Sequence, residues 1–136
     1  MTKWAHSLIR ISNYEVETLQ KRLSEVVERR CAIEMRLAAL AAEEEAEALH
    51  ARQNAEAGVY MAGFKQGVKI RRAKLHTDLA GVLAEEEGAR DALSEAFEAL
   101  KKFEKVAENA KLARLAETAK RETAAFDEMG LRRAAR

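Results

Sequence analysis

One stretch of this chain, Leu19 to Leu40, limits what the whole can fold into. Its seam residues recur at alternating intervals of four and three, which is the heptad pattern of a coiled coil. Such spacing places a narrow apolar seam along one side of a helix, whereas a helix in a globular core shows a broader apolar face. The stretch therefore predicts a long helix that packs along one other helix. The seam residues are Leu19, Leu23, Val26, Arg30, Ile33, Leu37 and Leu40.

The composition favours long helices over a globular core. The chain has 136 residues and no proline, with 35% charged and only 5% aromatic residues, a balance typical of coiled coils. The formal net charge of +1 does not indicate a polyanionic partner or a membrane surface. Cys31 is the only cysteine, which suits a reducing compartment. The start lacks the apolar stretch of a signal peptide and no apolar run could span a bilayer, so we expect a cytoplasmic protein.

A cluster of glycines separates the first seam from a second one. Gly58, Gly63 and Gly67 lie within ten residues, and glycine commonly ends helices. We therefore expect a helix over about 3–57, a glycine-rich tip at 58–67 and a second helix over about 68–134. The second seam is richer in alanine and changes phase near residue 110. Its residues are Val68, Leu75, Leu79, Val82, Glu86, Ala89, Leu93, Ala96, Leu100, Phe103, Ala107 and Ala110.

Two seams joined by a short turn predict an antiparallel hairpin. The expected fold class is all-α, with two long helices forming one coiled-coil hairpin over residues 1–136. Folding near residue 62 would bring together residues whose numbers sum to about 125. Arg30 is then expected near Glu95, and the acidic run at 43–45 opposite residues near 80. About ten residues at the end of the second helix would extend beyond the first.

No motif in the sequence indicates catalysis. The phosphate-binding loop, the HExxH zinc motif and cysteine clusters are all absent. Cys31 lies beside the seam and is expected to be an ordinary surface residue. His50 and His76 lie on opposite flanks of the predicted seam, so we expect no metal site, and we expect no cofactor or small-molecule substrate. Charges alternate in sign along both helices without a basic stripe, which argues against nucleic-acid binding.

The two ends of the chain carry the pattern most typical of a binding surface. Near the start a second apolar stripe is offset from the seam, and a two-helix seam cannot bury both. No acidic residue precedes Glu15, and only basic charges follow Glu128. An exposed apolar patch with a basic rim usually marks a partner site, although homodimer packing or frayed ends would leave the same pattern. The predicted patch comprises Trp4, Leu8, Ile11, Phe126, Met129, Leu131, Arg132 and Arg133.

The chain resembles the flagellar export protein FliJ family in its alphaproteobacterial form. The resemblance covers the whole chain and is carried by the start at 3–11, the glutamate-rich first helix, the glycine cluster and the closing stretch at 122–136. It implies a non-enzymatic antiparallel coiled coil, similar to the central stalk of rotary ATPases. Such a protein would serve flagellum assembly and motility from the cytoplasm, at the cytoplasmic face of the inner membrane. Its implied partners are the hexameric export ATPase, the membrane export-gate protein and the export chaperones.

The resemblance also implies where these partners bind. The basic, apolar base would enter the ATPase ring, and the gate contact would lie nearer the tip. In that half Leu37 and Leu40 match the family's pattern, but Glu43 and Glu47 replace the aromatic residues expected just beyond. Alternative tip contacts are Tyr60, Met61 and Phe64.

Two other functions stay open at this point. The chain could be the equivalent stalk of a virulence type III secretion system, or a self-associating scaffold of parallel or swapped dimers. The stalk interpretation expects a chain that is monomeric on its own, whereas the scaffold interpretation expects an obligate dimer.

Overall fold

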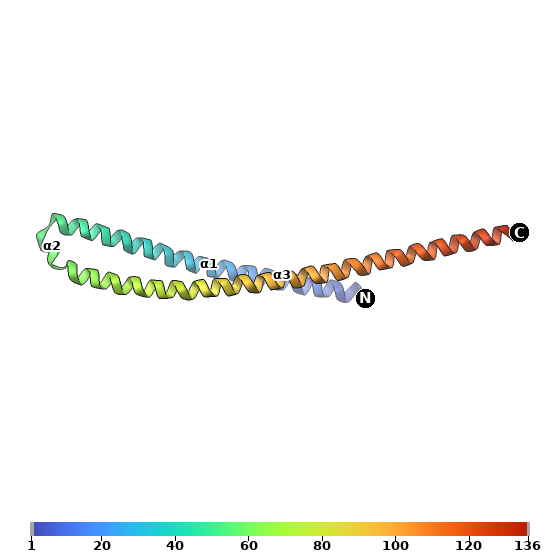
Figure 1. The fold of residues 1–136 in the computed structure, drawn as a ribbon, viewed down its shortest axis with the longest axis horizontal. Coiled ribbons are helices and arrows are strands. Elements are labelled where there is room, and N and C mark those ends of the chain that lie inside the picture. Colours follow the sequence, from blue (N-terminus) through green and yellow to red (C-terminus); the bar gives the residue numbers. More distant parts are fainter. Residues whose placement is uncertain (1, 136) are drawn as a thin grey trace. The chain divides into compact units, whose positions relative to one another are not determined.

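The computed structural model describes residues 2–135, and they form three helices. These are α1 (Thr2–Gln53), α2 (Ala55–Val59) and α3 (Met61–Ala134), in that order along the chain (Figure 1). The described residues contain no strand. The long helix α1 packs against α3, so the predicted all-α fold of two long antiparallel helices is confirmed.

The chain divides into two compact units. The hairpin unit is Thr18–Leu93, and the terminal unit combines the residues up to Glu17 with those from Ser94 onward. In each unit a stretch of α1 packs on a stretch of α3. The expectation of a single hairpin domain over residues 1–136 stays a prediction.

The core of the hairpin unit is the predicted seam. Val26, Ile33 and Val82 form a buried cluster, and Leu37, Leu75 and Leu79 pack against it. Val26 is only 2% exposed, although it lies between two helices and not inside a globular core. Removing an aliphatic side chain of this size from water contributes roughly 1.5–3 kcal/mol. Spacing by seven along α1 puts successive side chains into the same seam, so few large residues suffice.

The chain turns back earlier than the glycine cluster predicted. Helix α1 ends at Gln53, and Asn54 adopts an extended conformation with φ −134° and ψ 111°. The Asn54 side-chain oxygen accepts a hydrogen bond from the Glu56 backbone N–H at 3.0 Å, which caps α2. Gly63 and Gly67 lie inside α3, and no glycine has a positive φ. Glycine permits a break without requiring one, whereas an asparagine cap actively stabilises a new helix start.

The earlier turn changes the register of the two helices. Cross-helix ion pairs in the hairpin unit join residues whose numbers sum to between 114 and 116, not about 125. Arg30 therefore pairs with Glu86 and not with Glu95. The acidic run beginning at Glu43 lies opposite Arg71 and Arg72, not opposite residues near 80. The same residues still form the seam of each helix, but each of them meets a different residue of the other helix.

Two glycines weaken the middle of α3 without a structural need. Gly81 and Gly88 are helical, and a Cβ atom added at either position would meet nothing within 4 Å. Each Gly→Ala substitution should therefore raise the free energy of unfolding by about 0.5–1 kcal/mol. Urea denaturation would measure the change, with Ala84→Gly on the same exposed surface as a control of opposite sign. An unchanged or lower stability in both alanine variants would contradict the expectation.

Candidate docking site

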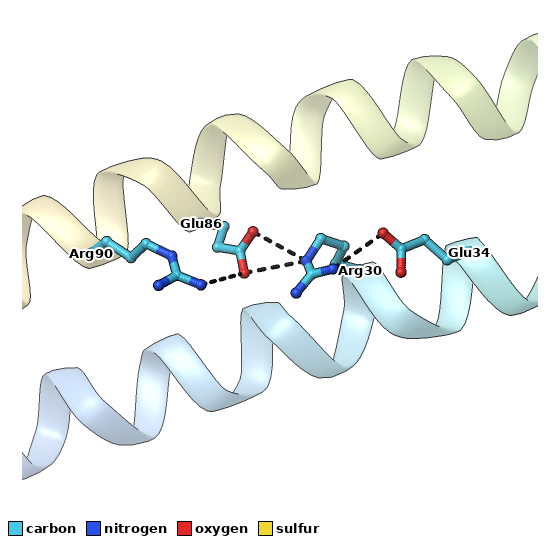
Figure 2. Close-up of polar contacts among 4 residues, drawn as sticks. All are labelled: Arg30, Glu34, Glu86 and Arg90. Atoms are coloured by element: carbon cyan, nitrogen blue, oxygen red, sulfur yellow. Dashed lines mark hydrogen bonds and ion pairs between the residues drawn. The ribbon is translucent and has the colours of Figure 1, made fainter.

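The hairpin unit contains one buried carboxylate, that of Glu86, and it is fully matched by cations (Figure 2). Arg30 Nε lies 3.1 Å from Glu86 Oε2, and Arg90 Nη2 lies 3.3 Å from Glu86 Oε1. The second arm of the Arg30 guanidinium pairs with Glu34 Oε1 at 3.1 Å. The hydrogen bond to Glu34, and then the charge of Glu86, raise the pKa of Arg30 above its ordinary value.

This polar layer fixes how the two helices align. Both carboxylate oxygens of Glu86 face a cation, Oε2 facing Arg30 and Oε1 facing Arg90. A slip by one heptad would place Glu86 against an apolar seam residue, and an unpaired buried carboxylate is costly. The layer therefore selects the observed register over its neighbours.

Ion pairs between the two helices, along the seam and beside it, favour the antiparallel direction. Arg29 pairs with Glu85 beside the polar layer, and two heptads along α1 the signs reverse. There Glu43 lies 3.7 Å from Arg71, and Glu44 pairs with Arg72. In a parallel, in-register pair of copies, seam residues would face their own copies, so Arg30 would face Arg30 and Glu44 would face Glu44. Such exposed pairs contribute little stability, but the like-charge alternative is disfavoured.

Acidification should remove the contribution of the Arg29–Glu85 pair. The hydrogen bond from Arg29, and then its charge, lower the pKa of Glu85 below its ordinary value of 4.5. A carboxyl whose folded-state pKa is lowered stabilises the fold above its unfolded-state pKa, and that contribution is lost as the pH falls through the lowered value. The melting temperature of Glu85→Gln should thus lie slightly below wild type at neutral pH and converge with it as the pH falls through the lowered pKa of Glu85. Circular-dichroism melts across this range would measure it, and a difference that persists in strong acid would contradict it.

In the terminal unit the seam is thinner and ends abruptly. Ala5, Ser12 and Val16 of α1 are buried, as are Ala96 and Leu100 of α3. Small side chains fill less of the space between two helices, and the last layer shows this directly. There a cavity of about 220 Å³ is lined by Ala5, His6, Ala107, Glu108, Ala110, Lys111 and Arg114.

Beyond this layer α3 has no covering helix. Every described residue from Lys111 to Ala135 is exposed, and we call this stretch the uncovered segment. It is longer than the overhang of about ten residues expected from the sequence. The earlier turn is the reason. It places each residue of α1 beside a lower-numbered residue of α3 than the sequence predicted, so more of the end of α3 is left uncovered.

The uncovered segment carries its own heptad stripe. Because of the phase change near residue 110, this stripe lies roughly a third of a turn around the helix axis from the line of the seam, at about 100° per residue. Its large apolar side chains are between 56% and 72% exposed. Exposed apolar residues at heptad spacing are the pattern by which one helix packs on another. The terminal stripe consists of Leu112, Leu115, Ala119, Glu122, Phe126 and Met129.

The structure separates the two halves of the predicted base patch. Trp4 and Ile11 are exposed on α1, and Leu8 is half-buried beside them. Ala5 lies at the level of Ala107 and Ala110, whereas Phe126 lies sixteen residues farther along α3, roughly 24 Å at 1.5 Å per residue. The N-terminal residues therefore do not form one patch with Phe126, Met129 and Leu131. The observed register, shifted by about ten residues from the predicted one, explains the difference.

The C-terminal half of the predicted patch is available to a partner. Phe126 and Met129 belong to the terminal stripe, Leu131 is exposed off its line, and Arg132 pairs with Glu128 at 3.1 Å. Sequence reasoning left Leu112 and Leu115 out of the predicted site. The signal that could have included them was the phase change itself, because residues after it cannot continue the seam.

The predicted tip contacts also divide into two groups. Leu40 is buried and Leu37 packs on the core cluster, so both side chains face α3 and offer little surface to a partner. Tyr60 is 78% exposed in the turn between α2 and α3, and Met61 and Phe64 are half-buried at the start of α3. The tip contact that stays a prediction is thus carried by Tyr60, Met61 and Phe64.

The described residues offer few other sites. Residues 2–135 contain no group of three or more histidine, cysteine or acidic side chains that could hold a metal ion. His50 and His76 are both exposed. No helix among these residues is both long and apolar enough to cross a bilayer. The terminal stripe is accordingly the best candidate for a functional surface.

Comparison with known proteins assigns the chain to a family. No family model and no solved structure matches it. Over 135 residues it is 57% identical to the flagellar FliJ protein of Caulobacter vibrioides, in each of two strains. The match covers 99% of this chain and 97% of each relative. Identity at this level over nearly the full length of both proteins shows that the chain belongs to the flagellar FliJ protein family.

Proposed function

We propose that the chain is a non-enzymatic stalk and adaptor of the flagellar type III export apparatus. In this role it binds the hexameric export ATPase and promotes its assembly and turnover. It also links the ATPase to the membrane export-gate protein and to export chaperones, and is thereby needed for flagellum assembly and motility. The chain works in the cytoplasm, at the cytoplasmic face of the inner membrane. It carries out no catalysis and needs no cofactor.

The terminal stripe is the observation that supports this proposal best. A helix that exposes Leu115, Phe126 and Met129 to water gains stability when a partner covers them. Arg132 and Arg133 lie at the end of the same segment and are exposed, so they can meet acidic groups on that partner. Trp4 and Ile11 provide a second exposed surface in the terminal unit. The gate contact is proposed at Tyr60, Met61 and Phe64.

The alternatives kept open by the sequence are less well supported. The relatives are named as flagellar proteins, which favours the flagellar system over a virulence secretion system. The charged seam residues of the hairpin unit disfavour a parallel dimer, because like charges would meet at Arg30 and at Glu44. A swapped dimer would retain those ion pairs, and the solution mass of the purified chain distinguishes it from the monomeric hairpin.

A hydrolysis assay with the cognate export ATPase tests the proposal. The wild-type chain should increase ATP hydrolysis and the fraction of ATPase in rings. Reversing both charges in Arg132→Glu/Arg133→Glu should remove most of this effect. The matched control is Lys101→Glu/Lys102→Glu, an exposed basic pair on the covered part of α3, which should act as wild type does. Absence of stimulation by the wild-type chain would count against the proposal.

A further inference from the structure

Glu122 is the one charged residue in the terminal stripe. It occupies the position between Ala119 and Phe126 at which the heptad spacing calls for an apolar side chain, and it is exposed. On an uncovered helix this costs nothing, because water solvates the carboxylate. The cost arises only when a partner covers the stripe, so the nature of the partner decides whether Glu122 is tolerated.

The helix itself leaves the charge of Glu122 unmatched. Residues three and four positions away on a helix are neighbours, and for Glu122 these are Thr118, Ala119, Ala125 and Phe126. Among the described residues Glu122 makes no ion pair. By contrast, Glu117 pairs with Arg121 at 3.0 Å and Glu128 pairs with Arg132 at 3.1 Å, both away from the stripe. The unmatched carboxylate thus faces whatever binds the stripe.

A second copy of the chain is a poor occupant. Antiparallel pairing of two stripes would match Leu112 with Met129 and Leu115 with Phe126, which is favourable. The same pairing would bring both Glu122 carboxylates into adjacent central layers, with Ala119 as the only residue opposite each. At the ends it would place Lys111 of one copy beside Arg132 of the other. A parallel pairing would set the two Glu122 side chains directly against each other. Both arrangements bury uncompensated charge.

We propose that Glu122 determines which partner the terminal stripe accepts. It keeps a second copy of the chain away, and it selects an apolar partner surface that presents a lysine or arginine at the middle of the stripe. A single polar residue at a seam position can set partner choice in a coiled coil in this way. The identification of this partner as the export ATPase rests on the function proposed above.

Self-association tests the first half without any partner. The wild-type chain should remain monomeric in sedimentation and light-scattering measurements up to about 0.1 mM, a range in which weak dimers are detected. Glu122→Leu should form dimers in that range, because it makes the stripe continuous. The control is Glu117→Leu, which adds the same side chain on the opposite side of the segment and should stay monomeric. A dimeric wild type, or a Glu122→Leu variant that stays monomeric, would overturn the proposal.

Binding to the export ATPase tests the second half. Glu122→Lys should weaken the affinity at least about tenfold, because it sets cation against cation. Glu117→Lys makes the same change outside the stripe and should leave the affinity unchanged. If the wild type binds and Glu122→Lys binds equally well, this inference fails while the proposed function stands. If the wild type does not bind, the proposed function fails together with this half, and the self-association measurement still decides whether Glu122 excludes a second copy.

Discussion

Replacing Val26 by aspartate is expected to unfold much of the hairpin unit. Val26 is 2% exposed and belongs to the buried cluster that includes Ile33 and Val82. An aspartate there would remove the valine contacts and bury a carboxylate in the apolar seam, where Arg30, four residues along the helix, is already paired with Glu34 and Glu86. We expect the free energy of unfolding to fall by about 3 kcal/mol or more, the range observed for unpaired buried charges. Circular dichroism with urea denaturation would measure the loss.

The matched control for this substitution is Met35→Asp on the same helix. Met35 is 72% exposed, so the same new charge should change the stability by less than about 0.5 kcal/mol. Equal effects of the two substitutions would mean that the seam does not lie where the structure places it.

Two charges introduced into the terminal stripe should abolish function without affecting the fold. Leu115 and Phe126 are exposed on the uncovered segment, so Leu115→Asp/Phe126→Asp removes no contact with the other helix. The melting temperature should therefore stay within a few degrees of wild type. Binding to the export ATPase should weaken by about thirtyfold or more, since a covered apolar anchor typically contributes more than about 1 kcal/mol and two are lost. Calorimetric titration and a thermal melt would measure both quantities.

Ile70→Asp serves as the control for the stripe. Ile70 is also an exposed apolar residue of α3, but it belongs to the hairpin unit and not to the uncovered segment. It should bind the ATPase as the wild type does. Loss of binding in both variants would indicate that any added acid interferes, and normal binding by the stripe variant would remove the terminal stripe as the docking surface.

The helices and their seams could be predicted from the sequence because heptad spacing is a strong and local signal. The heptad spacing repeats along α1 from Ala5 to Glu44, so a single ambiguous residue does not change the predicted helix or its seam. The turn could not be placed in the same way. The three glycines were the stronger turn signal in the sequence. The helix cap formed by the Asn54 side chain became evident only from its hydrogen bond to Glu56. One misplaced turn then shifted every cross-helix pair, because an antiparallel register depends on where the chain reverses.

The candidate site was predicted in part for the same reason. Its apolar and basic residues at 126–133 were recognised from their pattern alone, which does not depend on register. Whether Trp4 lies beside Phe126 does depend on it, and the structure separates these residues. The extent of the uncovered segment, and hence the inclusion of Leu112 and Leu115, also follows from register. Partner surfaces at the end of a hairpin therefore require the turn to be located first.

Disulfide cross-linking tests the antiparallel hairpin and its register most directly. In a Cys31→Ser background, Ile33→Cys/Val82→Cys should form an intramolecular disulfide on oxidation, because both residues belong to one buried cluster. The product should migrate as a monomer on a non-reducing gel, and Ile33→Cys/Ala92→Cys should not close within the chain. Cross-linking of Ile33→Cys/Val82→Cys only between two chains, or closure of Ile33→Cys/Ala92→Cys in its place, would contradict the hairpin described here.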